Sequence, residues 1–238
     1  MKQLKLLLFT FFLFLSTQIF SQNWEWGKHV TGTGNIFNQL TAIDADGNII
    51  VAGAKNGLTT FVGTSYTLNA AANSPFLAKY NPDGSIAWLV DIGGDGATNT
   101  DATNTKGLVI DSQGNIIIAG QFRSGTQKCA FRSTNTTGLN PNDSIQSLGV
   151  QDAYLAKYDT NGNLLWVYNI GQGTGDDRAF GVTTDADNNI FVGGYFASTT
   201  FTIRGAAGTL TKTVGNTSGG DGFLVKYSSD GTYQWHHH

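Results

Sequence analysis

The sequence predicts an all-β protein built from about three repeats of a four-stranded antiparallel unit. Three observations indicate this. A hairpin-like stretch recurs along the chain, a shorter pattern precedes each full copy of it, and beyond the N-terminal segment no part shows the 3.6-residue apolar period of a helix. The composition agrees, because the chain has 31 glycines, only 3 prolines and 13% charged residues.

The recurring hairpin is clearest at residues 152–171, DAYLAKYDTNGNLLWVYNIG. Apolar residues alternate on both sides of the turn at 160–163, so each strand offers one apolar face to a core. Related stretches lie at 74–93, SPFLAKYNPDGSIAWLVDIG, and at 221–235, DGFLVKYSSDGTYQW. A hairpin that recurs this closely indicates a repeat fold.

The second pattern reads DADGNIIVAG at 44–53, DSQGNIIIAG at 111–120 and DADNNIFVGG at 185–194. Each copy begins with a polar turn and continues into a strand rich in Ile and Val that ends on glycine. A short strand also lies just before each turn, so we expect the turn to join two strands as a hairpin. Together with the later hairpin, this gives each repeat four strands in meander order.

Tryptophan marks the last strand of each unit, at Trp26, Trp88, Trp166 and Trp235. Aromatic residues at equivalent positions are expected to pack between neighbouring units, because every unit needs the same filler. Repeated four-stranded antiparallel units are typical of the blades of a β-propeller. A β-helix or solenoid is the second interpretation, but its coils are shorter and more uniform in length than these units.

We therefore predict β-propeller repeats over residues 22–238, with units at approximately 22–93, 94–171 and 172–238. Three blades do not close a ring, since propellers typically have four to eight. The chain opens with a Trp strand that lacks the rest of its blade and stops within another. We expect an incomplete ring, either truncated at its C-terminus or closed by self-association, because an open arc exposes a whole sheet face.

The segment GDDRAFGVTTDADNNIFVGGYF at 175–196, followed by DGFLVKYSSDG at 221–231, resembles the bacterial SBBP-type β-propeller repeat. The resemblance covers nearly all of the chain after its first residues and is strongest over 152–196. It is weakest at 22–40 and at 121–150, and GGDGATNTDATNTK at 93–106 departs from it. The resemblance implies an exported, Bacteroidetes-like protein with a structural repeat that carries no shared catalytic residues.

Residues 1–21 are predicted to be a signal peptide. Lys2 and Lys5 precede an apolar run at 6–20, and a small residue then offers a cleavage point before Gln22. The run is shorter than the roughly 20 apolar residues of a spanning helix, and no basic cluster follows it. We expect a secreted or cell-surface protein with no membrane insertion after cleavage.

The net charge of −3 is scattered along the chain, so there is no electrostatic case for nucleic acid or an anionic membrane as a partner. The single cysteine, Cys129, excludes an internal disulfide. We interpret Cys129 as a small buried side chain in a strand rather than as a nucleophile.

The turn at 44–48, DADGN, resembles the opening of a calcium loop, and Asp185 and Asp187 form a second copy. The EF-type pattern fails because Lys55 occupies its twelfth position. Asp and Asn also favour hairpin turns, since they tolerate the left-handed backbone region. We predict structural turns and no cofactor, with another kind of Ca²⁺ site as the alternative.

No catalytic, cofactor-binding or metal-ligating set is predicted. Gly171–Gly175 is not followed by the helix that a nucleotide loop needs. His29 reads as a half-exposed residue of a strand, and His236–His238 as a flexible tail that cannot fix metal geometry. Asp176–Arg178 is the densest charge cluster, for which we expect a structural salt bridge or turn rather than a lining of a channel or rim.

These observations predict a non-enzymatic module that presents variable loops to a protein or glycan ligand, or that acts as a scaffold. Tyr66, Phe131 and Tyr195 are the candidates for contact with sugar. The alternative is the propeller part of an extracellular polysaccharide hydrolase or lyase whose catalytic residues lie outside this chain.

Overall fold

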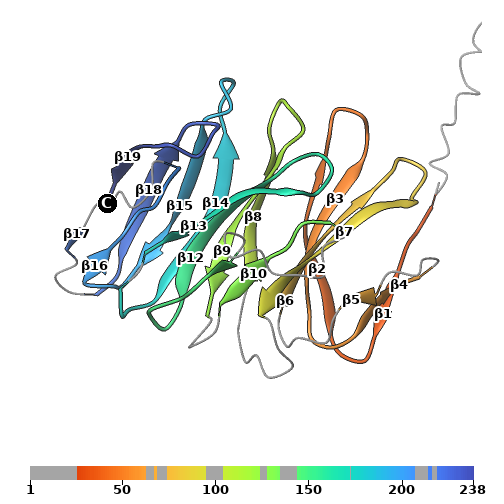
Figure 1. The fold of residues 1–238 in the computed structure, drawn as a ribbon, viewed down its shortest axis with the longest axis horizontal. Coiled ribbons are helices and arrows are strands. Elements are labelled where there is room, and N and C mark those ends of the chain that lie inside the picture. Colours follow the sequence, from red (N-terminus) through yellow and green to blue (C-terminus); the bar gives the residue numbers. More distant parts are fainter. Residues whose placement is uncertain are drawn as a thin grey trace, which may run out of the picture.

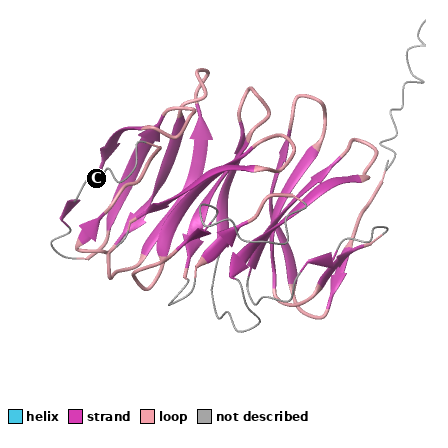
Figure 2. Ribbon diagram, viewed as in Figure 1, coloured by secondary structure: helices cyan, strands magenta, loops and turns pink. Residues whose placement is uncertain are grey.

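The computed structural model describes residues 26–62, 67–68, 74–94, 104–123, 128–134, 144–171, 173–206, 214–215 and 219–238. Every regular element in these ranges is a β-strand (Figure 2). A helix able to span a membrane is therefore not found among them. The predicted signal peptide, at 1–21, lies outside the described residues.

Three antiparallel sheets each contain four strands in meander order. The first sheet consists of β2 (Ile36–Ile43), β3 (Ile49–Lys55), β6 (Ser74–Tyr80) and β7 (Ile86–Gly94). The second sheet consists of β8 (Asn104–Ile110), β9 (Ile116–Phe122), β12 (Asp152–Tyr158) and β13 (Leu164–Ile170). The third sheet consists of β14 (Asp177–Thr184), β15 (Ile190–Phe196), β18 (Asp221–Tyr227) and β19 (Tyr233–His237). The predicted all-β fold of four-stranded antiparallel units is confirmed.

Shorter strands add to this framework. β10 (Cys129–Phe131) and β11 (Ser144–Ile145) extend the first sheet, because β10 pairs with β7. Two small sheets are separate from the three large ones: β1 (Val30–Gly32) with β4 (Thr59–Phe61) and β5 (Thr67–Leu68), and β16 (Thr200–Phe201) with β17 (Val214–Gly215). Part of the predicted second repeat thus completes the edge of the sheet formed by the first.

The three large sheets lie side by side in a row, with the second in the middle (Figure 1). Successive residues of β9 face opposite neighbours, as the two-residue period of a strand requires. Ile116 and Ile118 belong to the apolar cluster shared with the first sheet, whereas Ile117 and Ala119 belong to the cluster shared with the third. A sheet buried on both faces explains why β9 is almost continuously apolar.

Six hairpin turns share one backbone pattern, at 44–48, 81–85, 111–115, 159–163, 185–189 and 228–232. In each, the fourth residue has a positive φ; it is glycine in five turns and Asn188, at 62°, in the sixth. This is a type I turn followed by a left-handed residue, which suits three-residue hairpin loops. The turns lie together at one end of the sheets, the upper edge of Figure 1, which we call the short-turn face. We call the opposite end, where the longer connections run, the long-loop face.

Candidate functional site

A lysine in the third strand of each large sheet pairs with the aspartate that opens the first hairpin turn of the same sheet. The Nζ–Oδ2 distances are 3.0 Å for Lys79–Asp44, 2.9 Å for Lys157–Asp111 and 3.7 Å for Lys226–Asp185. Two of these lysines also reach the next sheet. Lys79 Nζ donates to Thr160 O at 3.3 Å, and Lys157 Nζ donates to Ser229 O at 2.8 Å. The ammonium groups of Lys79 and Lys157 therefore each join a carboxylate of their own sheet to a turn of the neighbouring sheet.

Two tryptophans also donate hydrogen bonds to turns of this kind. Trp88 Nε1 donates to Thr160 O at 3.1 Å, and Trp26 Nε1 donates to Pro82 O at 2.8 Å. The indole of Trp88 also covers Gly162, since a Cβ added there would lie 2.9 Å from Trp88 Cδ2. We call this combination of lysine, tryptophan and turn glycine the inter-sheet lock. The indole of Trp26 contacts the first sheet as that of Trp88 contacts the second, as the repeat predicted. Residues 26–29 form no strand, however, so the Trp strand predicted at Trp26 is wrong there.

The Asp-led turns use their carboxylates internally. Asp44 Oδ1 accepts hydrogen bonds from the backbone N–H groups of Asp46 and Asn48, and the Asn48 amide donates to both oxygens. Burial opposes ionisation of Asp44, but the bonds from Asn48 and Lys79 outweigh it, so the pKa of this carboxyl is lowered. Asp111 and the predicted second copy, at Asp185, bond their turns in the same way. No group of three or more potential metal ligands occurs in the described ranges.

Two buried carboxyl groups lie where the second and third sheets meet at the long-loop face. Asp152 Oδ2 accepts from Leu148 N at 2.9 Å, and Asp177 Oδ2 accepts from Ser198 Oγ at 2.7 Å. Both residues are 0% exposed. Burial raises the pKa of Asp152 to about 7, and the nearby Asp177 carboxyl adds to the increase. The pKa of Asp177 is raised mainly by burial.

Because of these two buried carboxyl groups, we expect the free energy of unfolding to decrease as the pH rises from about 4 to 7. Between these values the folded protein retains the Asp152 proton that the unfolded chain releases, and Asp177 acts in the same direction. The difference between 3.8 and about 7 corresponds to on the order of 4 kcal/mol of unfolding free energy. Urea unfolding across this range measures it. Asp152→Asn should remove most of the slope, whereas Asp221→Asn, at the exposed equivalent position of β18, should leave it unchanged.

A pocket of about 290 Å³ adjoins the carboxyl pair. Its lining includes two cationic side chains, Lys128 and Arg204, together with the buried Asn169. Ile145 and Leu148 form its apolar part. The Asn169 amide donates to the backbone carbonyl of Gln146 at 2.8 Å, which holds the 144–148 segment against β13. The sequence offers no motif for this pocket, because its residues are far apart and come from different repeats.

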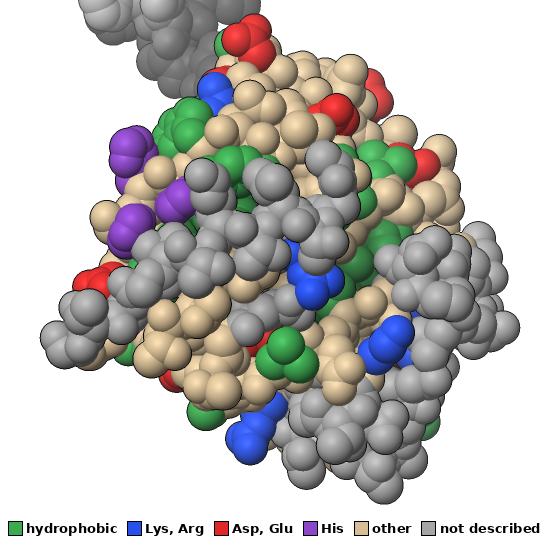
Figure 3. All heavy atoms as spheres, turned by 60° about the vertical axis from the view of Figure 1, so that its left-hand side comes forward, with side chains coloured by type: hydrophobic (Ala, Val, Ile, Leu, Met, Phe, Trp, Pro, Cys, Tyr) green, Lys and Arg blue, Asp and Glu red, His purple; other side chains and the backbone are tan. Residues whose placement is uncertain are grey.

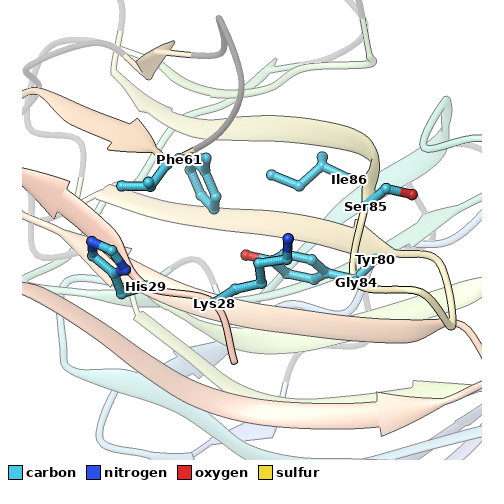
Figure 4. Close-up of a pocket in the computed structure, with 8 residues that line it drawn as sticks. Lys28, His29, Phe61, Tyr80, Gly84, Ser85 and Ile86 are labelled. Atoms are coloured by element: carbon cyan, nitrogen blue, oxygen red, sulfur yellow. The ribbon is translucent and has the colours of Figure 1, made fainter. Parts of the chain in front are cut away.

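A second pocket, also of about 290 Å³, lies between the N-terminal segment and the first sheet (Figure 4). Lys28 and His29 line it from the N-terminal segment, and Phe61 and Tyr80 from the strands opposite. Trp26 stacks on Tyr80 with the ring centroids 6.2 Å apart. His29 is exposed and precedes β1, so its predicted place within a strand is wrong.

The other sequence candidates have structural places. Cys129 is buried in β10, as predicted. Arg178 donates to both carboxylate oxygens of Asp176, the predicted salt bridge. The histidines predicted as a tail instead continue the Trp strand, because β19 extends to His237 and His236 Nδ1 lies 2.7 Å from the Tyr233 hydroxyl.

Of the three aromatic candidates for sugar contact, Phe131 is fully buried against Tyr154, with ring centroids 4.9 Å apart, so it offers no platform to a ligand. Tyr195 is half-buried, and Tyr66 lies outside the described residues. Gly171–Gly175 is followed by the strand β14.

Comparison with known proteins gives one informative similarity. No family model matches the chain. An uncharacterized WD repeat-containing protein of Acanthamoeba polyphaga mimivirus is 30% identical over 171 residues, which is 67% of this chain and 12% of the viral protein. WD repeats form the four-stranded blades of β-propellers. The four-stranded antiparallel sheets and this similarity together suggest a β-propeller fold.

Proposed function

We propose that the chain forms three blades of an incomplete β-propeller and serves as a non-enzymatic binding or scaffold module. The observation that carries this proposal is the inter-sheet lock. It joins the first sheet to the second through Lys79 and Trp88, and Lys157 joins the second to the third. Trp26 repeats the contact on the other side of the first sheet. In a ring of blades, each sheet contacts the next through residues at equivalent positions, and these contacts follow that pattern.

The outer face of the third sheet supports the incomplete ring. Ile117 and Leu155 of the second sheet are 0% exposed, because the third sheet covers them. At the equivalent positions of the third sheet, Phe191 is half-buried and Leu224 is 40% exposed. Figure 3, which brings this end of the row forward, shows hydrophobic side chains at the surface. A further blade, from a longer chain or from another copy, would bury them.

The lock residues of the third sheet point to the same conclusion. Lys226, the counterpart of Lys157, lies 5.1 Å from the centre of the Phe191 ring and makes no contact with another turn among the described residues. A next blade with an Asp-led turn would offer a carbonyl to Lys226 and to the indole of Trp235, as Ser229 and Thr160 do within the chain.

We propose that the module acts at the cell surface or in the medium, because of the signal-like segment at 1–21 and the resemblance to the SBBP-type repeat.

We further propose that ligands bind at the long-loop face. The short-turn face is built of six nearly identical turns, whereas the connections opposite differ in length and sequence, and variable loops on a rigid scaffold are where binding residues concentrate.

The buried carboxyl pair supports a non-enzymatic role for this part of the protein. Among the described residues, Asp152 and Asp177 have raised carboxyl pKa values, but both are fully buried and bonded to backbone N–H groups. A general acid or base must come within hydrogen-bond reach of its substrate, and this geometry leaves no such access.

Labelled protein comprising residues 22–238, applied to peptide and glycan arrays, tests the proposal. We expect a restricted set of ligands to be retained. A polyethylene glycol chain attached at Leu148→Cys, on the long-loop face, should block retention, whereas the same chain at Ala45→Cys, on the short-turn face, should not. The native Cys129 is 1% exposed and should not react. No retention on either array, or cleavage of an arrayed polysaccharide, would contradict the proposal.

A further inference from the structure

We infer that the pocket between Lys128 and Arg204 binds a carboxylate group of an acidic peptide segment on a partner protein. The inference rests on the proposed binding function and adds the class of ligand. The pocket lies on the long-loop face, where β11 of the first sheet, the end of β13 and the segment after β16 meet, and acidic residues are absent from its described lining.

The cations of this pocket differ from the buried lysines of the described chain, because Lys128 is exposed and Arg204 is half-buried. Lys55 and Lys157 each pair with an aspartate, at 3.1 and 2.9 Å, so their charges are compensated within the protein. Lys128 and Arg204 form no ion pair with a described residue, and Arg204 Nε is buried without a hydrogen-bond acceptor. An incoming carboxylate would compensate these two charges, and guanidinium groups bind carboxylates through paired hydrogen bonds.

The remaining lining favours a peptide over an acidic sugar. Ile145 is half-buried and Leu148 is 61% exposed, so aliphatic surface lies next to the two cations. None of the described lining residues is aromatic, and a ring that could stack on a sugar is therefore missing from the pocket wall. A glutamate flanked by aliphatic residues matches this combination of charge and apolar surface. The volume, about 290 Å³, is at the lower end for small-ligand pockets and suits one or two side chains.

Backbone contacts fix the positions of the walls before a ligand binds. Gly171 N donates to Thr202 O at 2.7 Å, and Ile170 pairs with Ile203, so the segment that carries Arg204 lies along the end of β13. The Asn169 amide holds the opposite wall through Gln146 O. A preorganised pocket binds more tightly because less conformational freedom is lost.

Fluorescence polarisation with residues 22–238 and a labelled peptide of sequence GLEIEVG tests the inference. We expect saturable binding that weakens with salt, and binding at least about tenfold weaker for GLQIQVG. Arg204→Gln and Lys128→Gln should each weaken binding of the acidic peptide by about tenfold, and Arg204→Lys by less. Lys106→Gln, which removes the same charge from an exposed position of β8 outside the pocket, should leave binding unchanged. Urea unfolding confirms that each variant is folded.

Equal affinity for the two peptides, or unchanged affinity in Arg204→Gln, would overturn the inference. So would an equal loss in Lys106→Gln, since binding would then follow net charge alone. Binding of a galacturonate oligomer without binding of the peptide would also overturn it, because the ligand would be a glycan. Array ligands that survive Arg204→Gln count against this pocket and leave the proposed function intact. Failure to retain any array ligand counts against the proposed function itself.

Discussion

Gly162→Ala should destabilise the protein by about 3 kcal/mol or more, whereas Gly114→Ala should cost only about 1–2 kcal/mol. The two glycines occupy the same turn position, with φ values of 79° and 81°, so the backbone strain of an alanine is nearly equal. Their surroundings differ. A Cβ at Gly162 would lie 2.6 Å from Thr134 Cγ2 and 2.9 Å from Trp88 Cδ2, whereas at Gly114 the nearest atom would be 3.8 Å away.

The difference between these two variants therefore reports the packing of Thr134 and Trp88 together on the turn of the next sheet. Urea unfolding of residues 22–238 gives both free energies, and similar slopes would show that the two unfolding transitions expose similar surface. Equal costs for the two substitutions would mean that neither Thr134 nor the indole of Trp88 packs closely on Gly162, which would contradict the packing contact of the inter-sheet lock.

Lys157→Met should destabilise the protein by about 3–5 kcal/mol. The side chains of Lys157 and Asp111 are only 4% and 0% exposed, and the lysine also donates to Ser229 O. Removing it leaves a buried carboxylate without its charge partner and a turn carbonyl without its donor, and burial of an unpaired charge is among the costliest changes in a protein. The measurement is again equilibrium unfolding in urea.

Lys226→Met provides the control at the same position of the third sheet. Its pair with Asp185 is 3.7 Å long, and the two side chains are 23% and 34% exposed, so the loss should be about 1 kcal/mol or less. Asp111→Asn combined with Lys157→Met should recover part of the stability, since it removes the unpaired charge. If both lysine variants cost the same, the contact of Lys157 with the third sheet contributes little.

Much of this fold could be predicted from local sequence pattern. The alternation in DAYLAKY predicts β12, and the Asp-led turns predict the hairpins, because both signals depend on neighbouring residues alone. The equivalence of Trp26 and Trp88 was also readable from the repeat. The pairing of β10 with β7 was not, since a long connection separates the two strands and tertiary contacts decide which edge accepts the added strand.

The candidate sites were harder to predict. Lys79, Lys157 and Lys226 recur in every repeat, as do Asp44, Asp111 and Asp185, and this joint recurrence was the available signal for the ion pairs. It was missed because lysine is usually at the surface. The pocket of Lys128 and Arg204 has no such signal, because its residues come from irregular segments of different repeats and meet only in the stacked sheets.

The central claim is that successive repeats stack as blades through the inter-sheet lock, and hydrogen exchange of the tryptophan indole N–H groups tests it most directly. NMR of ¹⁵N-labelled protein, with resonances assigned by Trp→Phe variants, follows each indole separately. We predict slow exchange for Trp88, whose Nε1 donates to Thr160 O, and fast exchange for Trp235, which has no such acceptor among the described residues. Gly162→Ala should accelerate exchange more at Trp88 than at the other indole groups. Fast exchange at Trp88 in the unaltered protein, or equal protection at Trp235, would contradict the account.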